Sequence, residues 1–227
     1  MQEVERFRIR DLPHWDVPGA TYFVTSCLHG SIPARGLSDI VRFQRQLQDR
    51  RCPANVSSNE WKVRCWKMTF ARIDRWLDQE PAVRHLERKD LAEIVMDSLL
   101  KFAGERYTVF AFAVMPSHIH WVFRPNDTWV ETLNGTRTPR ERIMQGMKGF
   151  TAKECNMVWG QSGIFWQDES YDHWVRDIDE LERVILYVEN NPVVANLVAR
   201  PEDWPYSSAY FRHKLGLPLG AAIPSIA

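Results

Sequence analysis

Residues 113–123, with the sequence AVMPSHIHWVF, constrain the fold of this chain more than any other segment. Their β-branched and aromatic side chains predict a strand. Because successive side chains of a strand point to opposite faces, His118 and His120 share one face, and the apolar residues beside them share the other. Two imidazoles side by side on a rigid strand suit a divalent metal ion. Taken alone, the pair fits two ordinary half-buried histidines equally well, so the remaining chain must decide between the two interpretations.

Two further strands and four helices are predicted around this segment. Residues 21–28 and 107–114 have strand composition, and the second run forms a hairpin with the histidine strand through the break at residues 115–117. Apolar residues at helical spacing, bounded by capping residues, predict four helices, over residues 38–50, 90–103, 138–159 and 180–191. Pro192 is expected to end the last of these helices.

The order of these elements predicts an α+β fold, in which a small antiparallel sheet carries helices packed on one face. The length of 227 residues fits a single domain over residues 1–227, with its core at about 18–200. Residues 51–88 are a candidate insertion, of which the Trp-rich part from residue 61 onward has no assignable pattern or function. Residues 209–227 are rich in Pro and Gly, which predicts an irregular tail.

The composition limits the function classes only coarsely. Lys and Arg number 29, as do Asp and Glu, so the net charge does not indicate a nucleic-acid partner. The four cysteines lack the spacing of a zinc site, no signal peptide precedes them, and no apolar run reaches the ~20 residues of a membrane span. We therefore expect a cytoplasmic protein that does not enter the membrane.

Tyr187 and Asn191 are candidates for the second half of a site. They lie four residues apart in the predicted helix over residues 180–191, which places both on one helix face. The phenol offers a nucleophile, and the amide oxygen is a ligand for a hard cation such as Mg²⁺ or Mn²⁺. Since Asn191 precedes Pro192, its helical geometry is in question. Tyr187 also fits a core position of an amphipathic helix.

Basic residues at two places are candidates for phosphate contacts. The first group alternates with apolar residues at the start of the chain, and the second lies on the predicted helix over residues 138–159. In both places an ordinary solvated surface is the alternative. The candidates are Arg6, Arg8, Arg10, Arg140, Arg142 and Lys148.

Several blocks in order along the chain resemble the REP-associated tyrosine transposases, which are single-tyrosine transposases of the HUH endonuclease superfamily. The histidine–hydrophobe–histidine motif is His118-Ile119-His120, and the tyrosine helix is Tyr187-Val-Glu-Asn-Asn-Pro192. The resemblance also covers the opening strand, two middle blocks and the tail, at residues 10–15 with 19–25, 148–152, 165–176, and 197–198 with 204–208.

The resemblance implies a ferredoxin-like sheet that carries a single-stranded DNA nicking and joining site. In that reading His118, His120 and Asn191 hold Mg²⁺ or Mn²⁺, and Tyr187 attacks the scissile phosphate to form a 5′-phosphotyrosine link. The implied partner is single-stranded DNA folded into hairpins of repeated extragenic palindromes, bound by a nucleoid-associated monomer or homodimer. The alternative is a domesticated protein that binds such hairpins without cleaving them.

Overall fold

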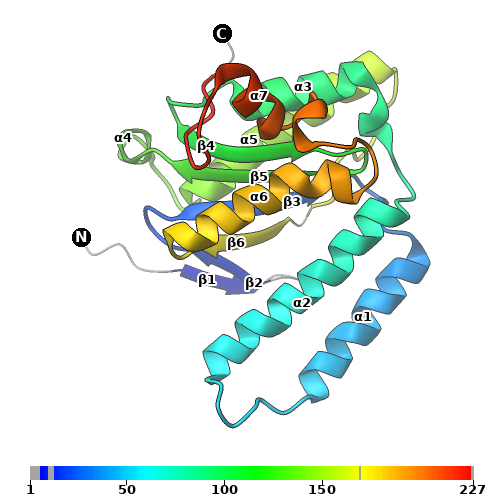
Figure 1. Cartoon of the computed structure of the whole chain (residues 1–227), viewed down its shortest axis with the longest axis vertical. Coiled ribbons are helices and arrows are strands. Elements are labelled where there is room, and N and C mark those ends of the chain that lie inside the picture. The colour runs from blue at the N-terminus through cyan, green and yellow to red at the C-terminus, as the bar shows by residue number, and fades with distance from the viewer. Residues whose placement is uncertain (1–5, 10–12, 169, 226–227) are drawn as a thin grey trace.

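A four-stranded antiparallel sheet forms the centre of the molecule (Figure 1). We describe a computed structural model, which covers residues 6–9, 13–168 and 170–225. The strand order is β4-β5-β3-β6, so that β5 and β3 are the inner strands. Their bounds are Thr21–Cys27 for β3, Tyr107–Val114 for β4, His118–Pro125 for β5 and Tyr171–Val175 for β6. β1 (Arg6–Ile9) and β2 (Pro13–Asp16) form a separate two-stranded sheet.

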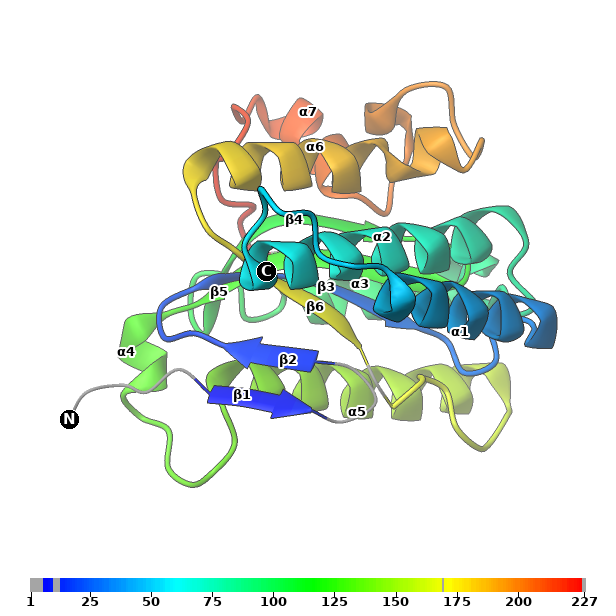
Figure 2. The ribbon, with the colours of Figure 1, turned by 90° about the horizontal axis from the view of Figure 1, so that it is seen from below.

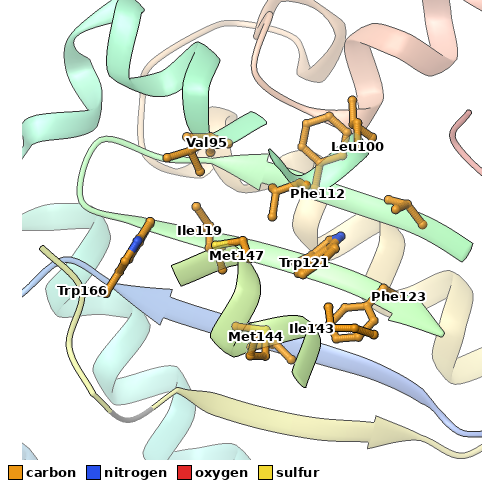
Figure 3. Close-up of a cluster of buried hydrophobic side chains, with 14 of the residues drawn as sticks. Val95, Leu100, Phe112, Ile119, Trp121, Phe123, Ile143, Met144, Met147 and Trp166 are labelled. Atoms are coloured by element: carbon orange, nitrogen blue, oxygen red, sulfur yellow. The ribbon is translucent and has the colours of Figure 1, made fainter. Parts of the chain in front are cut away.

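One face of the sheet packs against two helices, α3 (Lys89–Leu100) and α5 (Pro139–Trp159). The β5 residues Ile119, Trp121 and Phe123 alternate with the histidines, so they point away from them and into this layer (Figure 3). Trp121 is fully buried there. Burial of such large apolar side chains is the main stabilising term of the fold.

The opposite face carries the histidines and is covered by α6 (Ile178–Val194) and part of α2 (Ser58–Gln79). Leu181, Ile185 and Val188 of α6 pack against this face, while α5 lies on the far side of the sheet (Figure 2). The α+β class and the antiparallel sheet are confirmed. Helices, however, cover both faces rather than one, because the sheet is apolar on both sides.

The four strands of the sheet and the two helices α3 and α5 follow a ferredoxin-like order along the chain, β3-α3-β4-β5-α5-β6. Between β3 and α3 the chain forms a long hairpin of helices, α1 (Ala34–Asp49) and α2, which extends away from the sheet (Figure 1). Asp39 of α1 ties the two helices together, since it accepts hydrogen bonds from Arg72 at 2.6 and 2.7 Å and from the Trp76 indole at 3.0 Å. Residues 61–88, for which the sequence predicts no secondary structure, lie mostly in α2.

In the part of the chain that the structure describes, four shorter helices complete the fold, and two predicted segments differ from it. The short helices are η1 (His85–Glu87), α4 (Asp127–Val130), η2 (Pro201–Asp203) and α7 (Ser208–Leu215). The expected irregular tail over residues 209–227 thus begins with a helix, whose Arg212 is held by Glu189 of α6 at 3.0 Å. Pro192 does not end α6, which continues to Val194.

The helices found in the described ranges, 6–9, 13–168 and 170–225, include none that combines the length and the apolar character of a membrane span.

Candidate metal and tyrosine site

The side chains of His118 and His120 lie next to each other on one face of the inner strand β5. Both side chains are buried, and their Nε2 atoms lie 3.1 Å apart. The other ring nitrogen of each histidine has a hydroxyl partner: Nδ1 of His120 lies 2.8 Å from Thr25 Oγ1, and Nδ1 of His118 lies 2.9 Å from Ser117 Oγ. Hydroxyls behind the rings fix their orientation, and the two Nε2 atoms face a common position, as in metal-binding histidine pairs.

Ser117 also determines which nitrogen of His118 carries the proton. Its hydroxyl donates a hydrogen bond to the Leu77 carbonyl at 3.1 Å, so its oxygen accepts the proton of His118 Nδ1. Nε2 of His118 then carries a lone pair rather than a proton, the form that binds a metal. Burial, with the neighbouring His120 as a smaller cause, lowers the pKa of His118 to about 3. His118 is therefore neutral at physiological pH.

Asp74 of α2 adds a carboxylate to the pair. One ligand atom from each of Asp74, His118 and His120 lies within 4.8 Å of the others, and all three residues are buried. Asp74 Oδ1 lies 3.4 Å from Nε2 of His120. Two imidazoles and one carboxylate are a donor set that can hold a divalent metal ion.

Asp74 is not among the site residues predicted from the sequence, although its helix carries a signal. Phe70, Ile73 and Leu77 form the buried stripe of α2, and Asp74 lies on this stripe, four residues after Phe70. An aspartate on the apolar face of a helix is costly to bury without a partner. It therefore marks a site residue even when the helix itself is hard to recognise.

Tyr187 of α6 lies beside the histidines, as predicted. Its hydroxyl donates a hydrogen bond to Asp74 Oδ2, and its ring centroid is 5.7 Å from that of His120. The residue is 37% exposed, so part of the ring is open to solvent while the hydroxyl points inward. Burial of the hydroxyl and then the charge of Asp74 raise the pKa of Tyr187 well above its ordinary value of 10. The phenol is thus protonated in the absence of further positive charge.

Asn191 lies in the same site because α6 remains helical through Pro192. Its backbone carbonyl accepts the hydrogen bond from the Ala195 N–H at 2.9 Å, so the spacing of four residues between Tyr187 and Asn191 holds. The side chain is buried, with 2% of its surface exposed. The missing N–H of proline therefore leaves the geometry of Asn191 intact.

The site holds most of the unsatisfied polar atoms of the described residues. Among those residues, five buried side-chain oxygens or nitrogens lack a hydrogen-bond partner, and three of the five belong to the site: Oδ1 of Asp74, Oδ1 of Asp78 and Oδ1 of Asn191. A buried acceptor without a partner costs about 1–3 kcal/mol. The oxygens of Asp74 and Asp78 lie 3.4 and 3.7 Å from the Nε2 atoms of His120 and His118, and oxygens in this state fit a hard divalent cation as their partner.

Asp78, one helical turn after Asp74, differs from it in ionisation. Burial and the charge of Asp74 raise the pKa of Asp78 to about 8, so its carboxyl is largely protonated at neutral pH. Burial also opposes ionisation of Asp74, but His120, His118 and the Tyr187 hydroxyl together lower the pKa of this residue. The site therefore has one carboxylate and one neutral carboxyl before any ion binds.

A pocket of about 460 Å³ opens onto the tyrosine side of the site. It is lined by Asp74, Asp78, Tyr187 and Asn191, together with Arg183 one turn before the tyrosine. Arg183 is exposed and has no ion pair or hydrogen bond within the described ranges. The pocket thus offers a route from solvent to the Tyr187 hydroxyl, with a positive charge beside it.

The predicted phosphate contacts on α5 are used within the fold. Arg140 is 5% exposed and pairs with Asp172 of β6 at 3.0 Å. Arg142 donates a hydrogen bond to the Asn134 carbonyl, and Lys148 donates to the carbonyls of Gln167 and Asp168 at 2.7 and 3.1 Å. Moreover, α5 packs on the sheet face opposite to the histidines.

The amino-terminal candidates are less fully described. Arg6 and Arg8 lie in β1, where the structure describes the backbone, and Arg10 lies outside the described residues.

A comparison with curated proteins supports the resemblance read from the motifs. No family model matches the chain. A curated protein of Haemophilus influenzae, provisionally named a REP-associated tyrosine transposase, is 28% identical over 111 residues, which are 45% of this chain and 58% of that protein. A solved structure of a REP-associated tyrosine transposase bound to a REP hairpin has 16% identity and a TM-score of 0.49, over 100% of this chain and 94% of that one. The chain thus matches little more than half the length of its curated relative.

Proposed function

We propose that this chain is a tyrosine transposase of the REP-associated kind, which cleaves and rejoins single-stranded DNA at hairpin-forming repeats. The observation that carries the proposal is the position of the Tyr187 hydroxyl, which donates a hydrogen bond to Asp74 beside the His118–His120 pair and shares a pocket with Asn191. A nucleophile of this kind next to a candidate metal position suits phosphodiester chemistry. The curated relative, which bears that family name, supports the same reading.

In the proposed reaction, the Tyr187 oxygen forms a bond to the phosphorus of the scissile phosphodiester. The bond from phosphorus to the 3′-oxygen breaks, the phenol loses its proton, and the released 3′-oxygen gains one. The 5′-phosphate remains on Tyr187, and attack by a 3′-hydroxyl of another strand reverses the step. Because one phosphodiester replaces another, strand transfer needs no nucleotide cofactor.

The remaining site residues would bind and orient. His118, His120 and Asn191, with Asp74, would hold Mg²⁺ or Mn²⁺, which when bound supplies Lewis acidity towards the phosphate. The neutral His118 and the hydroxyls of Ser117 and Thr25 keep both ring nitrogens aimed at that position. For DNA contacts we retain Arg6, Arg8 and Arg10 as proposals and add Arg183. Arg142 and Lys148 are secondary candidates, and Arg140 is a buried structural residue.

The partner would be single-stranded DNA carrying a palindromic hairpin, bound in the cytoplasm at the nucleoid by a monomer or homodimer. We keep residues 1–227 as a single domain. The α1–α2 hairpin would be its principal insertion, since it interrupts the ferredoxin-like order between β3 and α3.

The test is formation of a covalent adduct. The protein is incubated with Mn²⁺ or Mg²⁺ and a 5′- or 3′-labelled single-stranded hairpin, and the products are separated after denaturation. We expect an adduct that carries the 5′ end of the downstream fragment for the wild type and for Tyr210→Phe, which changes a tyrosine of α7 outside the site. Tyr187→Phe should give none. An adduct with Tyr187→Phe would refute the assignment, and hairpin binding without any adduct would support the non-cleaving alternative.

A further inference from the structure

Helix α2 brings a carboxylate between the tyrosine and the histidine pair, although it lies in the hairpin inserted between β3 and α3. We propose that Asp74 is a shared group: Oδ2 positions the Tyr187 hydroxyl, and Oδ1 is a ligand of the metal ion held by the histidines. The inference rests on the proposed function, because it assigns the nucleophile and the metal position to one site. It adds a direct link between them.

The two oxygens of Asp74 have different surroundings. Oδ2 accepts the hydrogen bond from the Tyr187 hydroxyl. Oδ1 is buried, has no hydrogen-bond partner, and lies 3.4 Å from Nε2 of His120. A carboxylate has acceptor capacity on both oxygens, and leaving one of them unused inside a protein is costly. The free oxygen therefore points to an occupant on the histidine side.

The position of Asp74 is fixed by the packing of the preceding turns of α2. Trp66 stacks on His173 of β6, with ring centroids 5.1 Å apart and an interplanar angle of 25°. Lys67 pairs with Glu180 of α6 at 2.9 Å. Phe70 packs against Tyr187 itself, with ring centroids 6.3 Å apart. These contacts join α2 to the strand and the helix that border the site. The fold itself therefore holds Asp74 next to Tyr187 and the histidines.

Sharing one carboxylate has a chemical consequence. An ion that binds Oδ1 fixes the plane of the carboxylate and thereby the direction of the hydrogen bond at Oδ2. Conversely, the Tyr187 hydroxyl restrains the carboxylate for the ion. The metal position and the nucleophile should therefore be coupled even without DNA, and groups that support a ligand in this way typically contribute 10–100-fold to metal affinity.

The competing explanation is structural: Asp74 would only fasten α2 to α6 through the tyrosine. In that case loss of the hydroxyl or of the charge would change the unfolding temperature but leave metal affinity unchanged. Asp78 offers a second alternative, since its Oδ1 lies 3.7 Å from Nε2 of His118. The affinity of the metal-free protein for Mn²⁺ distinguishes these cases.

The experiment measures Mn²⁺ binding to the full chain without DNA, from the electron paramagnetic resonance signal of free Mn²⁺. We expect Asp74→Asn to raise the Kd at least tenfold and Tyr187→Phe to raise it about threefold or more. The double variant should bind no more weakly than Asp74→Asn, because both changes remove the same link. Glu60→Gln, which changes an exposed acid of α2, should bind as the wild type does.

Unchanged or tighter Mn²⁺ binding by Tyr187→Phe overturns the inference, as does loss of binding in Asp78→Asn but not in Asp74→Asn. If Asp74→Asn fails to fold, as judged by circular dichroism and thermal unfolding in EDTA, Tyr187→Phe decides, since it removes a single hydroxyl. An adduct at Tyr187 with no coupling in Mn²⁺ binding refutes the shared carboxylate alone. Coupled Mn²⁺ binding without any adduct refutes the proposed function instead.

Discussion

Glu180, in the first turn of α6, connects this helix to α2 and β6. Its carboxylate accepts hydrogen bonds from Lys67 Nζ at 2.9 Å, from the Arg176 backbone N–H at 3.1 Å and from His173 Nε2 at 3.1 Å. The group is buried, so water cannot replace these donors. Replacing Glu180 with glutamine keeps the shape of the side chain and removes its charge. The variant should therefore loosen the attachment between the helix that carries Asp74 and the helix that carries Tyr187.

The expected magnitude follows from the pKa of Glu180. Burial alone would raise this pKa, but hydrogen bonds from Lys67 and Arg176 and the contacts of His173 lower it from its ordinary value of 4.5 to about 2. At about 1.4 kcal/mol per pKa unit, the difference corresponds to about 3 kcal/mol of folding free energy. Since the Lys67 side chain is half exposed, screening reduces the figure. We expect Glu180→Gln to destabilise the protein by about 2–3 kcal/mol at pH 7.

The sign of the pH dependence follows from the direction of the pKa change. A carboxyl whose pKa is lowered by folding stabilises the protein above its unfolded pKa, and this stabilisation is lost as the pH falls through the folded value. The gap between wild type and Glu180→Gln should therefore be full above about pH 5 and should shrink between pH 4.5 and pH 2.

Urea unfolding at pH 7, 5, 4 and 3 measures this gap, and Glu182→Gln, which changes an exposed acid of the same helix, should stay within about 0.5 kcal/mol of the wild type. An equal gap at pH 3 and pH 7, or a gap below about 0.5 kcal/mol at pH 7, would refute the reasoning.

Three further perturbations test other parts of the molecule. Ser117→Ala removes the hydroxyl that holds His118 Nδ1, and it should weaken Mn²⁺ binding about tenfold in the same resonance assay; unchanged affinity would contradict the assigned tautomer. Arg183→Gln removes the exposed charge at the pocket, and it should lower hairpin affinity and reduce the slope of log affinity against log salt by about one, measured by fluorescence anisotropy. An unchanged slope would exclude a phosphate contact there. Ile185→Ala opens a cavity between α6 and the sheet, and it should destabilise the protein by about 2–5 kcal/mol in urea unfolding, whereas a loss below about 1 kcal/mol would show that the α6 interface is loosely packed.

The parts of the fold and site that depend on short-range patterns could be predicted from the sequence. The histidine strand follows from alternation with period two, and the shared face of Tyr187 and Asn191 follows from the helical spacing of four. The helix over Pro139–Trp159 follows from its capping box at Thr138 and Glu141. Each of these signals lies within a few residues of the element that it predicts.

The missed features depend on long-range packing. β6 is short and half polar, and its pairing with β3 defines it as a strand. Asp74 becomes a site residue because α2 folds across the histidine face; the local pattern marks an aspartate on an apolar stripe but not its histidine partners. Pro192 gives a local signal that wrongly predicts the end of the helix. It removes one helical hydrogen bond, but the packing of α6 on the sheet keeps the chain helical to Val194.

The site gathers its side chains in a fixed order along the chain, with Asp74 first, the two histidines next, and Tyr187 and Asn191 of α6 last. During synthesis on the ribosome, Asp74 and the histidine pair are therefore made before the group proposed to attack DNA. A growing chain lacks its cutting group until α6 has emerged, and α6 can seat only on a sheet that already contains β4 and β5. Under the proposed function, a copy of the protein truncated before Tyr187 would carry part of the metal site and no group to attack DNA.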